Sequence, residues 1–423
     1  MFIILLLLLI PLIIWAFMEP LGLRFLDVNS ATTSLGQIFG LIGMTLFSIN
    51  LILAGRFKFL DKYFKGLDKV YINHHKLGAI SFSLLLFHPL FLVIKYFSIS
   101  IREASLFFVP FVDMPITFGI ISLLLMIVLL SLTFYSKLKY HNWKISHKFM
   151  IVVFIFAILH TLVISSDIAR NDFLRYYVLI LALVGLATSF HQAFLGKFLI
   201  KKLKYKIINI SKLNKDIVEI EMEPLKRKMV FNSGQFAFFV FSNKGVGNES
   251  HPFTISSGST DDTLKITIKN LGDYTSLLKN LKQNDEVTID GPYGNFSYKT
   301  VPSKSQIWIA GGIGITPFIS MAKSLDDEYS IDLYYSVKED KEAVYVSNIQ
   351  EISQRNNRFK FNLWNVRDKG YINSEQILNL SNGLDSKDIF LCGHPLFMEN
   401  LKNQFVSLGV DIKKIHYENF SLF

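Results

Sequence analysis

Residues 71–93, with the sequence YINHHKLGAISFSLLLFHPLFLV, form an apolar stretch that contains His74, His75 and His88. A helix needs about 20 apolar residues to cross a membrane, and this stretch is long enough. Ionisable side chains inside a membrane helix are costly and usually have a function. The stretch therefore predicts a membrane helix whose histidines face a partner.

A second apolar stretch, residues 147–164, contributes His147 and His160. With 3.6 residues per turn, the interval from His74 to His88 brings both side chains to nearly one helix face, about 21 Å apart along the axis. Two helices with two histidines each at matching depths can hold two irons, each bound from both sides, as in stacked haems. The predicted iron ligands are His74, His88, His147 and His160.

Other interpretations stay open for these histidines. Each could be a polar packing residue, a helix-end residue near the headgroups or part of a proton relay. His75 is also a candidate ligand, because it precedes His88 by the same interval that separates His147 from His160. With that shorter interval, the two side chains do not lie on one helix face unless the helix is distorted. We therefore prefer His74, and we expect an irregular turn or skewed haems on the second helix.

The composition predicts a membrane part followed by a soluble part. Of 423 residues, 51% are hydrophobic and 39 are Phe, which is unusual for a soluble enzyme of this length. The apolar excess ends near Lys197. The net charge of +10 fits lysine-rich cytoplasmic loops better than nucleic-acid binding. The only cysteine is Cys392, so iron would have to be held by histidine.

The apolar stretches predict six membrane spans, at residues 1–18, 33–54, 71–97, 115–135, 143–164 and 173–194. The first has no positive n-region and no cleavage site, so we expect a retained helix rather than a signal peptide. Lys and Arg are concentrated in the connections after the second, fourth and sixth spans. The positive-inside rule then predicts a cell-membrane protein with both termini and the soluble half in the cytoplasm.

The second half changes from one strand pattern to another. Residues 206–210, 217–222, 235–241, 264–268 and 286–289 predict short antiparallel strands of a small β-barrel. Strands at 306–310, 332–337, 360–364 and 388–392 alternate with helices and predict a doubly wound parallel sheet. The predicted domains are therefore a six-helix domain at 1–200, a barrel at 201–302 and an α/β domain at 303–423.

The first strand of the predicted parallel sheet runs into the turn GGIGITP at residues 311–317. Glycines let backbone amides approach a pyrophosphate, and Pro317 suits a first helical turn. The spacing differs from the usual dinucleotide fingerprint, so a plain helix-capping turn is the alternative. The turn predicts a nucleotide site that includes Gly311, Gly312, Gly314, Thr316 and Pro317.

Several motifs in order resemble the transmembrane ferric reductase and NADPH oxidase superfamily, and most closely its short bacterial NADPH oxidases. They are the paired histidines, HPFTISS at 251–257, GDYT at 272–275, GPYG at 291–294, GGIGITP and LCGHPLFM at 391–398. The resemblance covers nearly the whole chain. It implies a membrane enzyme with FAD, two haem b and NADPH, or NADH as an alternative donor.

The resemblance also assigns residues. The implied FAD ligands are His251, Pro252, Phe253, Thr254, Ser256, Ser257, Gly272, Asp273, Tyr274 and Thr275. Cys392 and Gly393 would lie near the nicotinamide, and Phe420 would stack on the flavin, with Phe423 as its competitor. Cys392 and Phe420 are therefore the implied catalytic residues. Gly78, four residues after His74, matches the family motif and supports His74 as ligand.

NADPH also requires cations for its 2′-phosphate, which we expect beyond the second strand of the sheet at Ser336, Lys338 and Arg355. An ordinary solvated loop charge is the alternative for Lys338.

The electron acceptor stays open at this point. Leu92 stands where eukaryotic members often carry a further histidine, and residues 33–55 lack their arginine. The alternatives are an oxidase that forms superoxide from oxygen, a reductase of ferric or other metal chelates, and a haem-containing nucleotide sensor without turnover. No calcium-loop pattern and no long extension before the first span are present, so we expect no obligatory protein activator.

Overall fold

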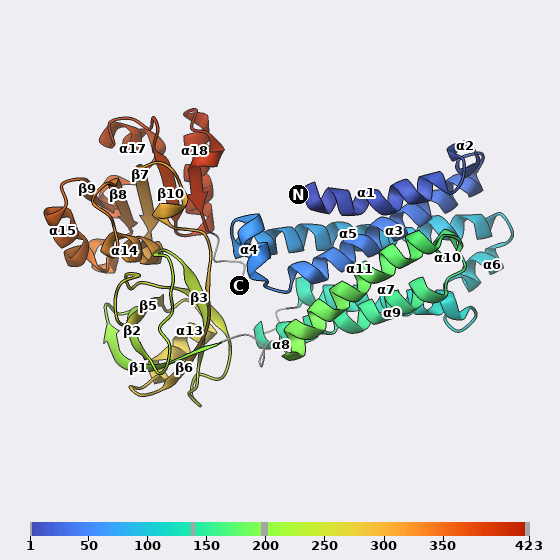
Figure 1. The fold of residues 1–423 in the computed structure, drawn as a ribbon, viewed down its shortest axis with the longest axis horizontal. Coiled ribbons are helices and arrows are strands. Elements are labelled where there is room, and N and C mark those ends of the chain that lie inside the picture. Colours follow the sequence, from blue (N-terminus) through green and yellow to red (C-terminus); the bar gives the residue numbers. More distant parts are fainter. Residues whose placement is uncertain (1, 137–139, 196–201, 419–423) are drawn as a thin grey trace. The chain divides into compact units, whose positions relative to one another are not determined.

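The computed structural model describes residues 2–136, 140–195 and 202–418. It divides into two compact units, one formed by residues 1–60 and 70–199 and the other by residues 61–69 and 200–423. We call them the helical unit and the mixed unit (Figure 1).

The helical unit consists of helices joined by short connections. In chain order, its long helices are α1 (Phe2–Phe17), α3 (Val28–Leu53), α5 (Leu67–Phe97), α7 (Met114–Tyr135), α8 (Tyr140–Lys148), α9 (Met150–Val163) and α11 (Asp172–Phe190). Short helices α2 (Leu21–Arg24), α6 (Ile101–Leu106) and α10 (Asp167–Arg170) lie in the connections, and α4 (Lys58–Phe64) links the units. A π-helical turn, His191–Leu195, follows α11.

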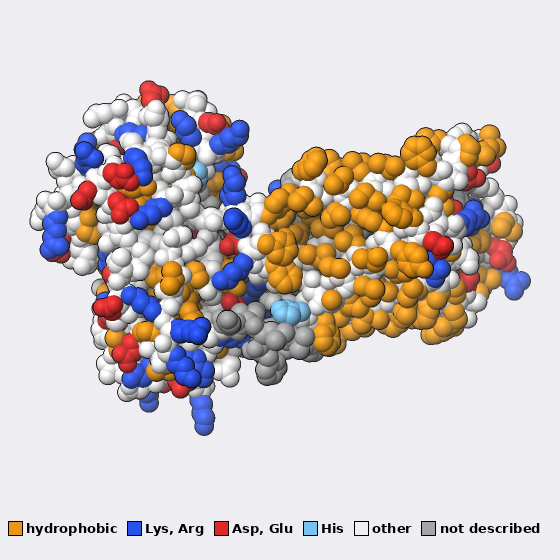
Figure 2. Space-filling model, viewed as in Figure 1, with side chains coloured by type: hydrophobic (Ala, Val, Ile, Leu, Met, Phe, Trp, Pro, Cys, Tyr) orange, Lys and Arg blue, Asp and Glu red, His pale blue; other side chains and the backbone are white. Residues whose placement is uncertain are grey.

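Five helical segments in the described residues are long and apolar enough to span a membrane, and α1 is a shorter apolar helix of 16 residues. The six predicted spans each correspond to one of these segments. Figure 2 shows hydrophobic side chains over most of the visible face of the helical unit. Such a surface is stable in lipid, where apolar side chains need no cover.

Local sequence explains where several helices begin. The Asp27 carboxylate accepts the amide of Ser30 at 2.7 Å at the start of α3. Asp113 does the same for α7, and Asn171 for α11. These side chains satisfy amides that have no partner inside the helix.

The fifth predicted span is interrupted, which is one of the two alternatives that the histidine interval predicted. Helix α8 ends at Lys148 and α9 begins at Met150, with Phe149 between them. The break lies between His147 and His160, so it changes the angle between their side chains. The prediction of an irregular turn on this span is confirmed.

The mixed unit starts with an antiparallel sheet in the order β4-β3-β6-β1-β2-β5. Its strands are β1 (Leu203–Lys212), β2 (Ile217–Pro224), β3 (Phe236–Phe241), β4 (His251–Thr254), β5 (Leu264–Lys269) and β6 (Glu286–Tyr293). A bridge between Ile255 and Ile266 brings the two edge strands together, so the sheet is a nearly closed barrel. Strand β4 was not predicted, because its residues read as a motif in a turn.

A parallel sheet follows, in the order β11-β10-β7-β8-β9. Its strands are β7 (Ser305–Gly311), β8 (Ser330–Val337), β9 (Phe359–Asn365), β10 (Asp388–Cys392) and β11 (Ile415–Tyr417). Helices α14 (Thr316–Lys323), α15 (Val346–Arg355), α17 (Ser374–Leu380) and α18 (Pro395–Ser407) connect them. Only β11 was missing from the predicted strands. The predicted fold class is confirmed.

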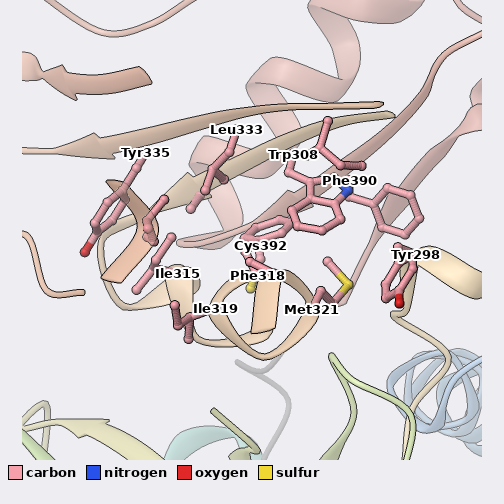
Figure 3. Packing of buried hydrophobic residues seen from close by; sticks show 14 of the residues in the cluster. Tyr298, Trp308, Ile315, Phe318, Ile319, Met321, Leu333, Tyr335, Phe390 and Cys392 are labelled. Atoms are coloured by element: carbon pink, nitrogen blue, oxygen red, sulfur yellow. The ribbon is translucent and has the colours of Figure 1, made fainter. Parts of the chain in front are cut away.

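The core of this sheet is packed with large aromatic residues. Trp308 of β7 stacks on Phe318 of α14, with ring centres 5.7 Å apart. Phe390 and Cys392 of β10 belong to the same buried cluster (Figure 3). The packing fixes α14 against β7 and β10, and therefore fixes the turn between β7 and α14.

Candidate cofactor sites

The structure brings the four predicted histidines together in two pairs. The ring centres of His74 and His147 are 6.2 Å apart, and those of His88 and His160 are 6.3 Å apart. Metal–imidazole bonds are about 2 Å long, so a metal bound by two rings holds their centres roughly 6 Å apart. Each pair therefore has a spacing that would let both imidazoles bind one metal.

Hydrogen bonds also orient three of these rings for ligation. Nδ1–H of His74 donates to the carbonyl oxygen of Asn50 at 3.0 Å. His88 donates in the same way to Gly36, and His160 to Pro115, each at 2.7 Å. A carbonyl only accepts, so Nδ1 carries the proton and Nε2 keeps its lone pair for a metal.

Glycines make room for these imidazoles. A Cβ on Gly40 would lie 2.7 Å from Nδ1 of His88, and one on Gly119 would lie 3.1 Å from Nδ1 of His160. His75 is exposed, whereas His74 is the ring that faces His147. Clusters of three or more His, Cys, Asp or Glu side chains that could hold a metal ion are absent from the described residues. Pairs, rather than clusters, suit a cofactor that supplies the remaining ligands itself.

The interior between the two pairs is apolar. Val153 and Phe154 of α9 are both fully buried, and they lie between His147 and His160 along the chain. Phe154 packs edge to face against Phe47 of α3, with ring centres 4.7 Å apart. An aromatic ring therefore occupies the interior close to the middle of the α9 segment.

In the mixed unit, the HPFT and GDYT motifs meet. The rings of His251 in β4 and Tyr274 in α13 (Asp273–Leu277) stack with centres 3.6 Å apart. Thr275 accepts the amide of Gly272 at 3.0 Å, which orders the turn before α13. The last two residues of the HPFTISS motif, Ser256 and Ser257, are fully buried. Two motifs separated by about 20 residues thus form one surface.

The glycine turn lies at a topological switch of the parallel sheet. Strand β7 lies between β8 and β10, so the chain leaves β7 in one direction and returns to its other side at β10. Ligands of such sheets bind at the carboxyl ends of the two strands. Gly311 and Gly312 are at the end of β7, and Cys392 and Gly393 are at the end of β10. The structure therefore brings these predicted residues together.

The turn depends on two of its glycines. A Cβ on Gly314 would lie 2.2 Å from the carbonyl oxygen of Cys392, so only glycine allows this approach. Gly312 has a φ of +55°, a conformation that costs other residues energy. Thr316 and Pro317 then begin α14, as predicted from the motif.

The residues predicted to bind the 2′-phosphate lie at different edges of the sheet. Ser336 and Lys338 are at the carboxyl end of β8, where Ser336 pairs with Gly311 of β7. Arg355 is at the end of α15, before β9, and binds Glu351. It therefore lies toward the amino ends of the strands, away from the nucleotide edge.

Arg367 is a residue that sequence reasoning missed. It follows the carboxyl end of β9, its amide donates to the Lys338 carbonyl at 3.2 Å, and its exposed guanidinium contacts Glu339 at 2.9 Å. Applying the carboxyl-end rule to the third strand as well as the second would have found it.

Cys392 lies near the buried carboxyl group of Glu418. Burial, and then the charge of Glu418, raise the pKa of the Cys392 thiol. Burial also raises the pKa of Glu418 well above its usual value, with further contributions from Asp68 and Asp61. Glu418 Oε1 accepts the amide of Asn295 at 3.2 Å, next to the GPYG motif. The other predicted catalytic residue, Phe420, and its competitor Phe423 lie outside the described residues.

Three protein families match successive parts of the chain. Residues 39–158 match the ferric reductase-like transmembrane component, residues 202–297 an FAD-binding domain, and residues 308–403 an oxidoreductase NAD-binding domain. The matched ranges contain the histidine pairs, the HPFT and GDYT motifs, and the glycine turn, respectively.

Curated relatives match about half of the chain. The chain is 28% identical over 184 residues to the glycine betaine monooxygenase reductase subunit of Pseudomonas aeruginosa, over 40% of this chain and 50% of that protein. It is 25% identical over 231 residues to dual oxidase 1 of Caenorhabditis elegans, over 52% of this chain and 15% of that protein. The chain thus spans half or less of the length of these relatives.

A solved structure similar in fold is flavohemoglobin from Malassezia yamatoensis, with a TM-score of 0.52 and 17% identity, over 93% of this chain and 98% of that one. That likeness concerns fold alone. The family matches say more about the separate parts. In chain order, the protein is similar to a ferric reductase-like transmembrane component, an FAD-binding domain and an oxidoreductase NAD-binding domain.

Proposed function

We propose that this protein carries electrons from cytoplasmic NAD(P)H, through FAD and two b-type haems, to oxygen on the outer face of the membrane, which becomes superoxide. The observation that carries the proposal is the double pairing of His74 with His147 and of His88 with His160. When bound, NAD(P)H supplies a hydride, FAD accepts it and releases electrons singly, and the haems carry single electrons through the apolar interior.

The helical unit would hold the two haems by these histidines. The lysine-rich connections support an orientation in which His74 and His147 bind the inner haem, and His88 and His160 the outer one. Because Nδ1 of three of these histidines donates to a backbone carbonyl, Nε2 of each would remain available to bind a metal. Phe154, which is buried and lies between His147 and His160 along the chain, would add an aromatic ring to the apolar interior.

The mixed unit would hold the other two cofactors. The stacked rings of His251 and Tyr274 belong to the FAD site, and the Gly311–Gly314 turn would take the pyrophosphate of the nucleotide with its amides. Cys392 and Gly393 would lie beside the nicotinamide, while Ser336 and Lys338 would face its 2′-phosphate. Phe420 as the ring that covers the flavin, and domain limits at 1–200, 201–302 and 303–423, stay part of the proposal.

Ferric-chelate reduction is the second candidate. The side chain of Leu92 packs against Gly36, whose Cβ would lie 2.7 Å from it and 3.2 Å from the carbonyl oxygen of His88. This apolar contact lies next to the outer histidine pair, and the Leu92 side chain cannot donate a hydrogen bond to bound oxygen. The contact therefore favours an acceptor other than oxygen. A haem-containing nucleotide sensor without turnover is the candidate from another class.

Purified protein with FAD and haem separates these candidates. On addition of NADPH, the haem should become reduced, which its absorbance reports. The protein should then consume oxygen and form superoxide without another protein. Electron flow to a ferric chelate without superoxide formation in air would support the reductase. NADPH binding without any haem reduction would support the sensor and contradict the proposed function.

A further inference from the structure

Helix α14 connects the two predicted cofactor sites. Its amino end is the glycine turn of the nucleotide site, and its body lies against the barrel segment that follows HPFT. Ser320 of α14 is fully buried. Its hydroxyl donates to the carbonyl oxygen of Ser257 at 2.6 Å and accepts the amide of Gly234 at 3.4 Å.

Further hydrogen bonds extend this contact along the helix. Lys323 donates to the carbonyl oxygen of Ser256 at 3.3 Å. Ser324, just after α14, accepts the amide of Ser259 at 2.9 Å and bonds the hydroxyl of Ser233 at 2.9 Å. The last residues of the HPFTISS motif, and Ser259 just after it, are therefore bonded by residues at the carboxyl end of α14.

A separate contact joins the same parts of the chain. The hydroxyl of Tyr345 bonds Glu219 of β2 and Thr267 of β5, and Thr267 bonds the hydroxyl of Ser256 at 2.9 Å. Tyr345 precedes α15 in a left-handed conformation with φ of +64°. A residue other than glycine keeps this conformation only where surrounding contacts hold it.

We infer that Ser320 is a positioning residue for hydride transfer. Its hydroxyl holds the glycine turn, and with it the nicotinamide, at a fixed distance from the HPFTISS motif. The inference rests on the proposed path from NAD(P)H to FAD. Reacting atoms must lie about 3–3.5 Å apart, and a shift of about 1 Å can slow a reaction a hundredfold. Ser320 is suited to this role because a single hydroxyl contacts two buried backbone groups of the barrel.

The test is the anaerobic rate of flavin reduction by saturating NADPH in full-length Ser320→Ala. We expect a decrease of roughly tenfold or more, with little change in KM, because the ring is misplaced rather than unbound. When the flavin is instead reduced photochemically, the rate of electron transfer from flavin to the acceptor should equal that of the wild type. Ser353→Ala is the control, since Ser353 bonds the Phe359 carbonyl at 2.8 Å within the α/β part.

If Ser320→Ala does not fold, Ser320→Cys replaces it, because a thiol fills the site of the hydroxyl but donates and accepts only weak hydrogen bonds. A flavin-reduction rate within twofold of wild type in the variant would overturn the inference. An equal loss in Ser353→Ala, or in the photochemical assay, would also overturn it by indicating general destabilisation. A wild-type protein whose flavin NADPH does not reduce would instead contradict the proposed function.

Discussion

Gly314 approaches the backbone of Cys392 so closely that an added Cβ would lie 2.2 Å from the Cys392 carbonyl oxygen. Gly314 lies in the turn that follows β7, and Cys392 is the last residue of β10. The two strands are neighbours at the point where the strand order reverses. Their contact places the glycine turn and the Cys392–Gly393 segment at one site.

Gly314→Ala should therefore move the turn away from β10. Cβ would meet backbone atoms rather than a flexible side chain, so we expect a loss of about 1–3 kcal/mol in the free energy of unfolding and weaker NADPH binding. Gly22→Ala is the control, because no atom lies within 4 Å of its Cβ position. The measurements are the apparent unfolding midpoint and the NADPH affinity. Wild-type values for both in Gly314→Ala would show that the approach is not needed.

Histidine substitutions should remove haem in pairs. His74→Ala or His147→Ala should lose one haem, and His88→Ala or His160→Ala the other, so haem content per protein falls to about half in each. His75→Ala should keep both haems, since His75 is exposed. Haem content and the reduced-minus-oxidised spectrum check this. Loss of a haem in His75→Ala but not in His74→Ala would reverse our assignment.

Nucleotide selectivity should depend on the carboxyl edge of the sheet. We expect the wild type to use NADH with an efficiency comparable to that with NADPH, because Lys338 provides a point charge rather than a fork. Lys338→Ala and Arg367→Ala should each lower kcat/KM for NADPH by up to about tenfold and leave the value for NADH nearly unchanged. Arg355→Ala, at the other edge, is the control. A strong NADPH preference that survives Lys338→Ala would remove Lys338 from the site.

Glu418 should make stability depend on pH. Burial raises the pKa of Glu418 in the native state, so its carboxyl stays protonated after the unfolded chain has ionised near pH 4.5. Stability from this group is therefore complete below that pH and is lost as the pH rises toward the native pKa.

Glu418→Gln should remove this loss. Within that window, the free energy of unfolding of the variant should rise relative to wild type by up to about 1.4 kcal/mol per pH unit. Apparent unfolding midpoints between pH 5 and 8 measure the difference, and Glu399→Gln, on the exposed face of α18, is the control. Parallel curves for wild type and Glu418→Gln would mean that the native carboxyl is already ionised.

The local pattern of the sequence was sufficient for the membrane helices, most strands and the glycine turn. Helical periodicity and the length of an apolar stretch are properties of neighbouring residues, so 71–93 and 147–164 could be assigned as helices before any contact was known. The interval between His147 and His160 predicted an irregular turn or skewed haems, and the helix is interrupted at Phe149. The motif at 311–317 likewise predicted a strand, a turn and a helix start in the right order.

The tertiary structure alone decided which distant residues meet. Both His74 and His75 fit the apolar stretch, and only the arrangement of the helices brings the ring of His74 to that of His147. The contacts of Ser320 with Ser257, and of Glu418 with Asn295, join residues 63 and 123 positions apart. Such contacts follow no local period, because they depend on how whole strands and helices are arranged.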